Sequence, residues 1–206
     1  MGIRSLRTAS ISTGVKRSKV WDQSAIVTNI GQLAYESIQT VTVGSGGSST
    51  ITFSSIPNTY KHLQIRAIAR GGSASTLDAI KLTFNGDGSS SNYVTLHQLY
   101  GSGSGTPASQ SSTSNGWIYQ SYITGANATS NVFGTFVTDI FDYSSTNKNK
   151  TTRTLAGSDQ NGSGFVTFGS GLWMNSSTAI NSITMVVDGG SNFAQPSQFA
   201  LYGIKG

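Results

Sequence analysis

The chain has 206 residues and a formal net charge of +5, and only 10% of its residues are charged. This length suffices for one sizeable hydrophobic core, and the absence of cysteine excludes disulfides and thiolate metal sites. No stretch approaches the ~18 consecutive apolar residues that indicate a membrane span, so we expect a soluble protein made in a cytoplasm, with no membrane partner.

Residues 1–20 hold the whole net charge of the chain. Five basic residues precede the first acid, Asp22, and the eight basic residues that follow are balanced by the eight acidic ones. We predict that residues 1–35 form an extended basic arm that docks on a partner. Its expected contact residues are Arg4, Arg7, Lys16, Arg17, Lys19 and Trp21.

Three roles are open for this arm. Nucleic-acid binding is the usual role of clustered Arg and Lys, but the five charges are spread thinly and no aromatic residue precedes Trp21. A solubilising tail is the second role. The third is an anchor on the acidic surface of another protein. Ordering the backbone costs roughly 1–2 kcal/mol per residue, so an arm without its own core needs a partner to hold it, and we favour the anchor.

From residue 36 onward, short segments alternate apolar and polar residues between Gly, Ser and Asn clusters. In residues 61–70, Leu63 and Ile65 fall on one face, while Gln64 and Arg66 fall on the other, as in an antiparallel strand with one wet face. The composition, rich in Ser, Thr, Asn and Gly, disfavours helices. We expect about ten strands, in residues 37–43, 49–55, 61–70, 80–84, 92–100, 116–123, 132–143, 150–157, 164–173, 180–187 and 198–205.

Turn signals divide these segments. Residues 84–88 (FNGDG) and 159–164 (DQNGSG) contain Asn-Gly, which tolerates the positive φ angles of a tight hairpin turn. Residues 101–116 (GSGSGTPASQSSTSNG) have no large apolar side chain, so we expect a surface loop there. Many short strands with frequent turns predict an all-β fold, an antiparallel β-sandwich or jelly roll over residues 36–206.

The histidines give no catalytic or metal site. A serine nucleophile needs a base and an orienting acid, but the two histidines, His62 and His97, occupy polar positions of predicted strands without a carboxylate motif. Two histidines without a nearby carboxylate motif are also a poor metal site. We therefore assign no catalytic residue, no metal ligand and no cofactor.

Asp139 and Asp142 are the best candidates for a pair of catalytic carboxylates. Glycoside hydrolysis needs two such groups about 5 to 10 Å apart, but a spacing of three residues in a strand points them to opposite faces. We expect them instead to form ion pairs with basic residues nearby, namely Lys148, Lys150 or Arg153.

Aromatic side chains are the candidates for binding a sugar or a partner surface. Trp117, Tyr119 and Tyr122 follow the Ser-Gly stretch and offer large rigid faces with polar tips. We predict that these three residues are the contacts for a host-surface glycan or a partner protein, if the chain has such a site outside the arm.

Four stretches carry a resemblance to a known group. They are residues 53–70 (FSSIPNTYKHLQIRAIAR), 84–101 (FNGDGSSSNYVTLHQLYG), 170–175 (SGLWMN) and 199–206 (FALYGIKG). In residue identity and order they resemble small virion structural proteins of marine tailed phages, especially cyanophages, of the capsid-decoration or fibre type. The resemblance covers most of residues 36–206 and implies a β-sandwich on the particle exterior without enzyme activity.

Composition and resemblance together lead to one expectation with two alternatives. We expect a non-enzymatic phage virion protein on the particle surface, a capsid decoration or cement protein docked by its basic arm. The alternatives are a tail-fibre or baseplate attachment protein and a host-glycan-binding module. Expected partners are capsid or tail subunits and further copies of the chain, in a trimer by analogy with decoration and fibre proteins; nucleic acid is not an expected partner.

Overall fold

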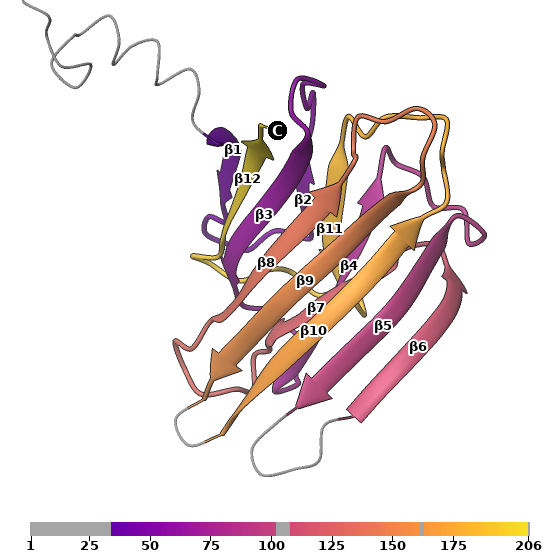
Figure 1. Ribbon diagram of the computed structural model, residues 1–206. Coiled ribbons are helices and arrows are strands. Elements are labelled where there is room, and N and C mark those ends of the chain that lie inside the picture. Colours follow the sequence, from indigo (N-terminus) through magenta and orange to yellow (C-terminus); the bar gives the residue numbers. More distant parts are fainter. Residues whose placement is uncertain (1–33, 102–107, 161–162, 206) are drawn as a thin grey trace, which may run out of the picture. The chain divides into compact units, whose positions relative to one another are not determined.

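The described part of the chain, residues 34–101, 108–160 and 163–205 of a computed structural model, consists of antiparallel strands and connecting turns (Figure 1). For residues 96–100 and 108–115 only the backbone is described, and the predicted arm lies outside the described residues. Twelve strands are present in this part: β1 Tyr35–Thr42, β2 Thr50–Phe53, β3 His62–Ala69, β4 Leu77–Phe84, β5 Tyr93–Gly101, β6 Ala108–Asn115, β7 Ile118–Thr124, β8 Gly134–Phe141, β9 Lys150–Asp159, β10 Gly164–Trp173, β11 Ile183–Val187 and β12 Gln198–Ile204.

The strands form two sheets, as the sequence predicted for a β-sandwich. One sheet has eight strands in the order β1-β12-β3-β8-β9-β10-β5-β6, and the other has four in the order β2-β11-β4-β7. The first four strands of the large sheet, taken with the small sheet, interleave along the chain as the eight strands of a jelly roll do. The fold is therefore a jelly-roll sandwich with additions.

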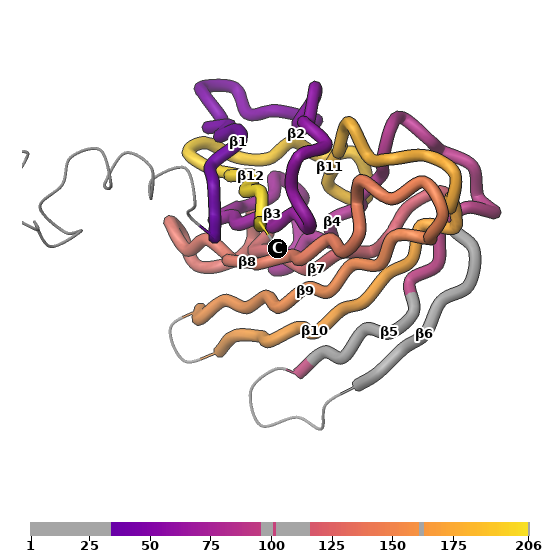
Figure 2. The backbone as a smooth tube through the Cα atoms, turned by 45° about the horizontal axis from the view of Figure 1, so that its top comes forward, coloured from indigo at the N-terminus to yellow at the C-terminus, as the bar shows by residue number. Residues whose placement is uncertain are grey.

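The additions are two pairs of strands inserted into the jelly roll. β5 and β6 lie between β4 and β7 in the sequence, and β9 and β10 lie between β8 and β11. All four join the large sheet beyond β8. Figure 2 shows β8, β9 and β10 side by side in one continuous layer. This extension widens one face of the sandwich.

The prediction of a surface loop over residues 101–116 is wrong for its second half. Residues Ala108–Asn115 form β6, which pairs with β5 at the edge of the large sheet. Alternation of apolar residues reports a buried face, and these eight residues contain no large apolar side chain that would give that signal. An edge strand needs backbone hydrogen bonds from one neighbour alone, so it forms without an apolar pattern.

The two Asn-Gly sequences have different outcomes. Asn85 and Gly86 adopt positive φ angles of 54° and 68°, as predicted. They do not close a hairpin, however, because β4 and β5 belong to different sheets. The second Asn-Gly, residues 161–162, lies outside the described residues. It connects β9 and β10, which do pair as a hairpin, and the N–H of Gln160 donates to the carbonyl of Ser163 at 2.7 Å.

The hydrophobic core lies between the two sheets. The predicted inward residues of β3 and β4, among them Leu63, Ile65, Ile80 and Leu82, are all fully buried. At one end of the core the rings of Phe84, Tyr93 and Trp173 pack together with centroids 5.5 to 6.3 Å apart. These three rings are among the largest fully buried side chains in the described part of the chain.

A close contact between β12 and the chain before β3 gives a prediction about stability. A Cβ atom at Gly203 would overlap the ring of Tyr60. Gly203→Ala should therefore lower the free energy of unfolding by about 1–3 kcal/mol, the usual cost of overpacking. Gly44 has open space around it, so Gly44→Ala should change the value by less than about 0.5 kcal/mol. Urea denaturation measures both, and equal values would contradict the prediction.

Candidate interaction surface on the eight-stranded sheet

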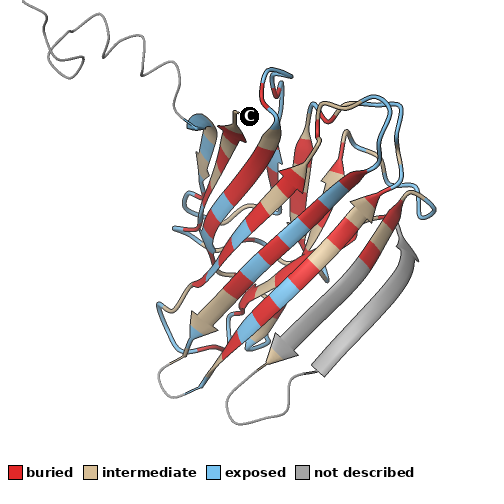
Figure 3. Ribbon diagram, in the orientation of Figure 1, coloured by how far each residue is buried: buried red, intermediate tan, exposed pale blue. Residues whose placement is uncertain are grey.

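The polarity of the large sheet is inverted at its centre. Val137 on β8, Leu155 on β9 and Phe168 on β10 point outward into solvent. Their neighbours along the strands, Thr138 on β8 and Thr154 on β9, point into the sandwich and are buried. The three apolar residues are direct cross-strand neighbours, Val137 opposite Leu155 and Leu155 opposite Phe168. Figure 3 shows the resulting alternation of buried and exposed positions along β9 and β10.

Two further apolar side chains complete this surface, Ile68 on β3 and Val166 on β10. We call the set of Ile68, Val137, Leu155, Val166 and Phe168 the outer apolar patch. Its members are between 38% and 54% exposed, and they make up five of the seven exposed large hydrophobic residues in the described part of the chain. Scattered exposed hydrophobic residues need no explanation, but a contiguous patch of them marks an interaction surface.

The buried threonines stabilise the fold less than apolar side chains at the same positions would. Thr138 and Thr154 share a hydrogen bond of 2.8 Å between their hydroxyls, and Gln120 on β7 donates to Thr138 Oγ1. Within the described residues, Gln120 Oε1 and Thr167 Oγ1 are buried without a hydrogen-bond partner. Burying a Val, Leu or Phe side chain stabilises by about 1.5–3 kcal/mol. Apolar residues at the inward positions and polar residues at the outward ones would therefore stabilise the fold more, and the outward patch needs another explanation.

A row of polar side chains borders the patch. Arg66 Nε donates to Gln64 Oε1 at 2.7 Å, and Gln64 Nε2 donates to Asp139 Oδ1 at 2.7 Å. Arg153 then donates to the other oxygen of Asp139 at 2.8 Å. We call these four residues the polar row. Because each side chain fixes the next, the row holds its charges in defined positions across β3, β8 and β9.

Aromatic rings hold the two ends of the polar row. The guanidinium of Arg66 lies over the rings of Tyr35 on β1 and Tyr202 on β12, 5.3 and 4.9 Å from their centroids. The guanidinium of Arg153 lies 5.5 Å from the ring centroid of Phe141. Such cation–π contacts contribute about 0.5–1 kcal/mol each at exposed sites. They restrict the arginines more than they stabilise the fold.

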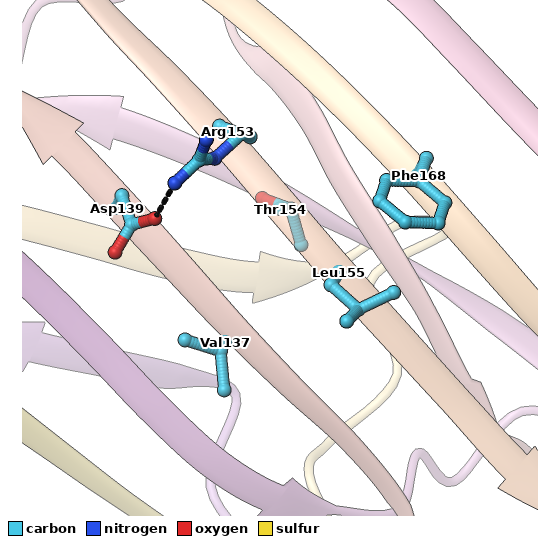
Figure 4. Close-up of a pocket in the computed structure, with 6 residues that line it drawn as sticks. All are labelled: Val137, Asp139, Arg153, Thr154, Leu155 and Phe168. Carbon is cyan, nitrogen blue, oxygen red and sulfur yellow. Dashed lines mark hydrogen bonds and ion pairs between the residues drawn. The ribbon is translucent and has the colours of Figure 1, made fainter.

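A shallow hollow lies where the patch meets the polar row. Its volume is about 370 Å³, and it is lined by Val137, Asp139, Arg153, Thr154, Leu155 and Phe168 (Figure 4). In Figure 4 the Asp139–Arg153 pair lies at one side, with Val137, Leu155 and Phe168 along the other. The hollow thus offers an apolar floor beside one carboxylate and one guanidinium. These groups suit contact with a protein side chain.

The prediction for the two aspartates is confirmed in its main part. Asp139 pairs with Arg153 and Asp142 pairs with Lys148, at 2.8 and 3.3 Å. Asp142 does not lie in a strand, because β8 ends at Phe141 and Asp142 occupies a turn with a φ of 51°. The two carboxylates are engaged with different cations rather than with each other.

Lys150 departs from that prediction. Its side chain is fully buried, its Nζ donates to the carbonyl of Asn175 at 2.7 Å, and the ammonium lies 5.4 Å from the ring centroid of Trp173. None of the ion pairs in the described part of the chain involves it. Burial lowers the pKa of the Lys150 ammonium. Its carbonyl and ring partners explain why it can stand inside the sandwich as a structural residue.

The predicted aromatic contacts lie on the small sheet rather than on the outer apolar patch. Trp117 precedes β7, and Tyr119 and Tyr122 belong to it. The Lys81 ammonium lies 3.9 Å from the Trp117 ring centroid and forms an ion pair with Asp188 at 2.5 Å. Trp117 Nε1 is buried, with no partner in the described residues. One face of the indole is therefore covered and its N–H is withheld from solvent, which does not suit a sugar platform.

The remaining two members of this group pack on the outer side of β7. The hydroxyl of Tyr119 donates to Asp188 Oδ2 at 3.1 Å, and Tyr122 lies opposite Ala79 of β4. Burial raises the pKa of Asp188, but hydrogen bonds from Lys81 and Tyr119 outweigh it and keep the pKa below its ordinary value. Asp188 is thus held as an anion that fixes both partners. This cluster ties the edge of the small sheet together.

The histidines have no catalytic arrangement in the described residues. His62 Nδ1 accepts a hydrogen bond from the Asp142 N–H at 3.1 Å, and its ring packs edge-on against Phe141 at 5.4 Å. The side chain of His97 lies outside the described residues. Across the described ranges, no three His, Asp or Glu side chains gather where they would hold a metal ion. No helix capable of spanning a membrane occurs in the same ranges.

Sequence reasoning missed the outer apolar patch, although a signal for it exists. In β9, alternation places Leu155 on the same face as Arg153, and in β10 it places Phe168 with Val166 and opposite Thr167. The pattern of each strand alone does not show which of its two faces is buried.

Comparisons with protein-family models, with curated proteins and with solved structures found no match to this chain.

The exposure of the patch gives a prediction for the isolated domain. Leu155→Ser should change the free energy of unfolding in dilute solution by less than about 1 kcal/mol, because half of the side chain is already in solvent. Ile65→Ala, at a fully buried position of β3, should lose about 2–5 kcal/mol. Chemical denaturation at low protein concentration measures both. A large loss for Leu155→Ser would mean that the patch belongs to the folding core.

Proposed function

We propose that this chain is a non-enzymatic structural protein of a bacteriophage virion, mounted on the particle surface as a capsid decoration or cement protein. The observation that carries the proposal is the inverted polarity of β8, β9 and β10, which leaves a contiguous apolar patch outside and threonines inside. A domain with such a face is suited to assembly. Catalysis instead needs converging reactive groups in a cleft.

The fold and the composition support the same proposal. Jelly-roll sandwiches are frequent among viral capsid and lectin domains, although a fold does not by itself assign a function. The four stretches that resemble phage virion proteins span the sequence from the end of β2 through β12. The low charge of residues 36–206 also suits a domain that is repeated many times on a scaffold, because like-charge repulsion between neighbouring copies stays small.

The basic arm supplies the attachment in this proposal. Arg4, Arg7, Lys16, Arg17 and Lys19 would contact an acidic surface of a capsid or tail subunit, and Trp21 would add an apolar anchor. Further copies of the chain are the second kind of partner. Since several weak contacts per assembly bind together by effective concentration, arms of a homo-oligomer would hold where one arm would not.

The structure bears differently on the two alternatives, a tail-fibre or baseplate protein and a host-glycan-binding module. A tail-fibre or baseplate protein would use the same fold, patch and arm, so only its place on the particle distinguishes it. A host-glycan-binding module would need accessible aromatic faces. The ammonium over Trp117 and the buried Nε1 do not favour that role for Trp117, Tyr119 and Tyr122.

The copy number on the particle tests the proposed location. Quantitative mass spectrometry of purified virions, compared with empty heads and with isolated tails, should find the chain in many copies on both virions and heads. A handful of copies confined to isolated tails would replace the decoration role by the tail role. Absence from all three preparations would overturn the virion proposal.

Deleting the arm tests the attachment. Removing residues 2–20 should leave the sandwich folded, because its core residues extend from Val43 to Leu201. The truncated chain should fail to join particles, with occupancy at least tenfold below that of the full chain. Circular dichroism measures the fold, and mass spectrometry of particles assembled with the variant measures incorporation. Normal incorporation would remove the anchoring role of the arm.

A further inference from the structure

The outward side chains of β3, β8, β9 and β10 form two parallel rows on the large sheet. The rows lie two residues apart along each strand, and the strand register sets their members. The first row is bulky throughout, whereas the second has small residues in its middle. The first row consists of Arg66, Val137, Leu155 and Phe168, and the second of Ile68, Thr135, Gly157 and Val166.

We propose that this face binds a second copy of the chain, with the two large sheets face to face about a two-fold axis. The axis lies in the interface, perpendicular to the strands and level with Ala156. The inference stands on this face alone and does not depend on the virion role. It concerns a contact between two domains, which is distinct from the trimer expected by analogy.

The two rows are complementary under this operation. A two-fold axis between them lays the first row of one copy on the second row of the other. In the middle of the rows Leu155 then lies opposite Gly157 and Val137 opposite Thr135, so that bulky side chains meet small ones. At the ends Phe168 lies opposite Val166, and Arg66 lies opposite Ile68. Sheets that pack face to face are about 10 Å apart with interdigitating side chains, and an offset of bulky and small rows satisfies this requirement.

The same operation brings opposite charges together. Arg153 and Asp159 lie on the outward face of β9, each three residues from Ala156, and both are exposed. The axis therefore places Arg153 of each copy opposite Asp159 of the other, and an isologous interface forms this pair twice. Arg153 already binds Asp139 through one nitrogen, but its side chain is 66% exposed. A guanidinium has five N–H donors, so donors remain for a second carboxylate.

This charge pattern is the reason to choose a second copy as the occupant. The face carries both signs at fixed positions, with Arg66, Arg153 and the Asp139 carboxylate on one side of the patch and Asp159 on the other. A partner of a single charge sign would meet like charge on one side or the other. A copy of the same face, turned by 180°, brings Asp159 to Arg153 and Arg153 to Asp159, while Arg66 lies opposite the apolar Ile68.

The size of the face predicts the strength of the contact. Four strands about 4.8 Å apart and about eight residues long cover roughly 500 Å² per copy. Stable complexes bury about 800 Å² per partner, and smaller interfaces belong to weak or transient complexes. The contact should therefore be a reversible dimer whose population depends on concentration.

Sedimentation velocity of the full chain over a range of concentrations tests the dimer. We expect a monomer–dimer equilibrium that Leu155→Asp weakens at least tenfold. Thr52→Asp, an exposed threonine on the small sheet, is the matched control and should leave the equilibrium unchanged. Circular dichroism checks that both variants fold.

Charge exchange tests whether the occupant is another copy. Arg153→Glu and Asp159→Arg should each weaken the dimer, and the double variant should associate more tightly than either single variant. A partner of a different sequence gives no such recovery, because both changes lie in one chain. If the double variant is weaker than both single variants, the two-fold arrangement is wrong.

A unique cysteine locates the contact. The natural chain has no cysteine, so Thr135→Cys with a short bismaleimide should give a covalent dimer, whereas Thr52→Cys should give little. The proposal is overturned if the chain stays monomeric at every concentration, if it forms a trimer, or if Thr135→Cys cross-links no better than Thr52→Cys. A monomer whose patch becomes protected only on particles would assign the face to a different virion protein.

Discussion

The register of β8, β9 and β10 is the constraint on which the outer apolar patch depends. Side chains alternate along a strand, so a shift of one residue would exchange the two faces. β8 is fixed by inward Phe136 and Ile140, and β10 by inward Phe165 and Trp173. β9 has no large apolar side chain pointing inward, and it takes its register from the two neighbours. A one-residue slip of β9 would bury Arg153 without a partner, which is strongly unfavourable.

The polar interior beneath these strands follows from the same register. Once Phe136 and Ile140 point inward, Thr138 between them must do so too, and its hydroxyl is satisfied by Thr154 and Gln120. The threonines therefore replace part of the apolar core by a hydrogen-bonded layer. The same register leaves Val137, Leu155 and Phe168 exposed on the outer face, where the proposed contact would form. One alignment of the strands therefore determines both the buried layer and the exposed patch.

The sequence predicted the strands well and the faces only in part. Alternation identified β3 and β4, because Leu63, Ile65, Ile80 and Leu82 are separated by polar residues in an unbroken pattern. The same reasoning fails for β6, whose residues carry no apolar signal. It cannot choose a face for β9 either, where both sides mix small, polar and charged residues. Which sheet a strand joins depends on long-range pairing. For this reason the sequence indicated a hairpin turn at Asn85 and Gly86, where the chain passes from the small sheet to the large one.

The size and the charged border of the outer apolar patch explain how it can remain exposed without causing aggregation. The patch is small, and charged side chains border it at Arg66, Arg153 and Asp159, which disfavours contacts that are out of register. A contact of this size is weak in free solution. If the arm holds copies close together on a scaffold, the effective concentration rises and the same face becomes occupied. In the proposed assembly a face of this limited strength would be an advantage, because a larger apolar surface would associate before the copies reach the scaffold.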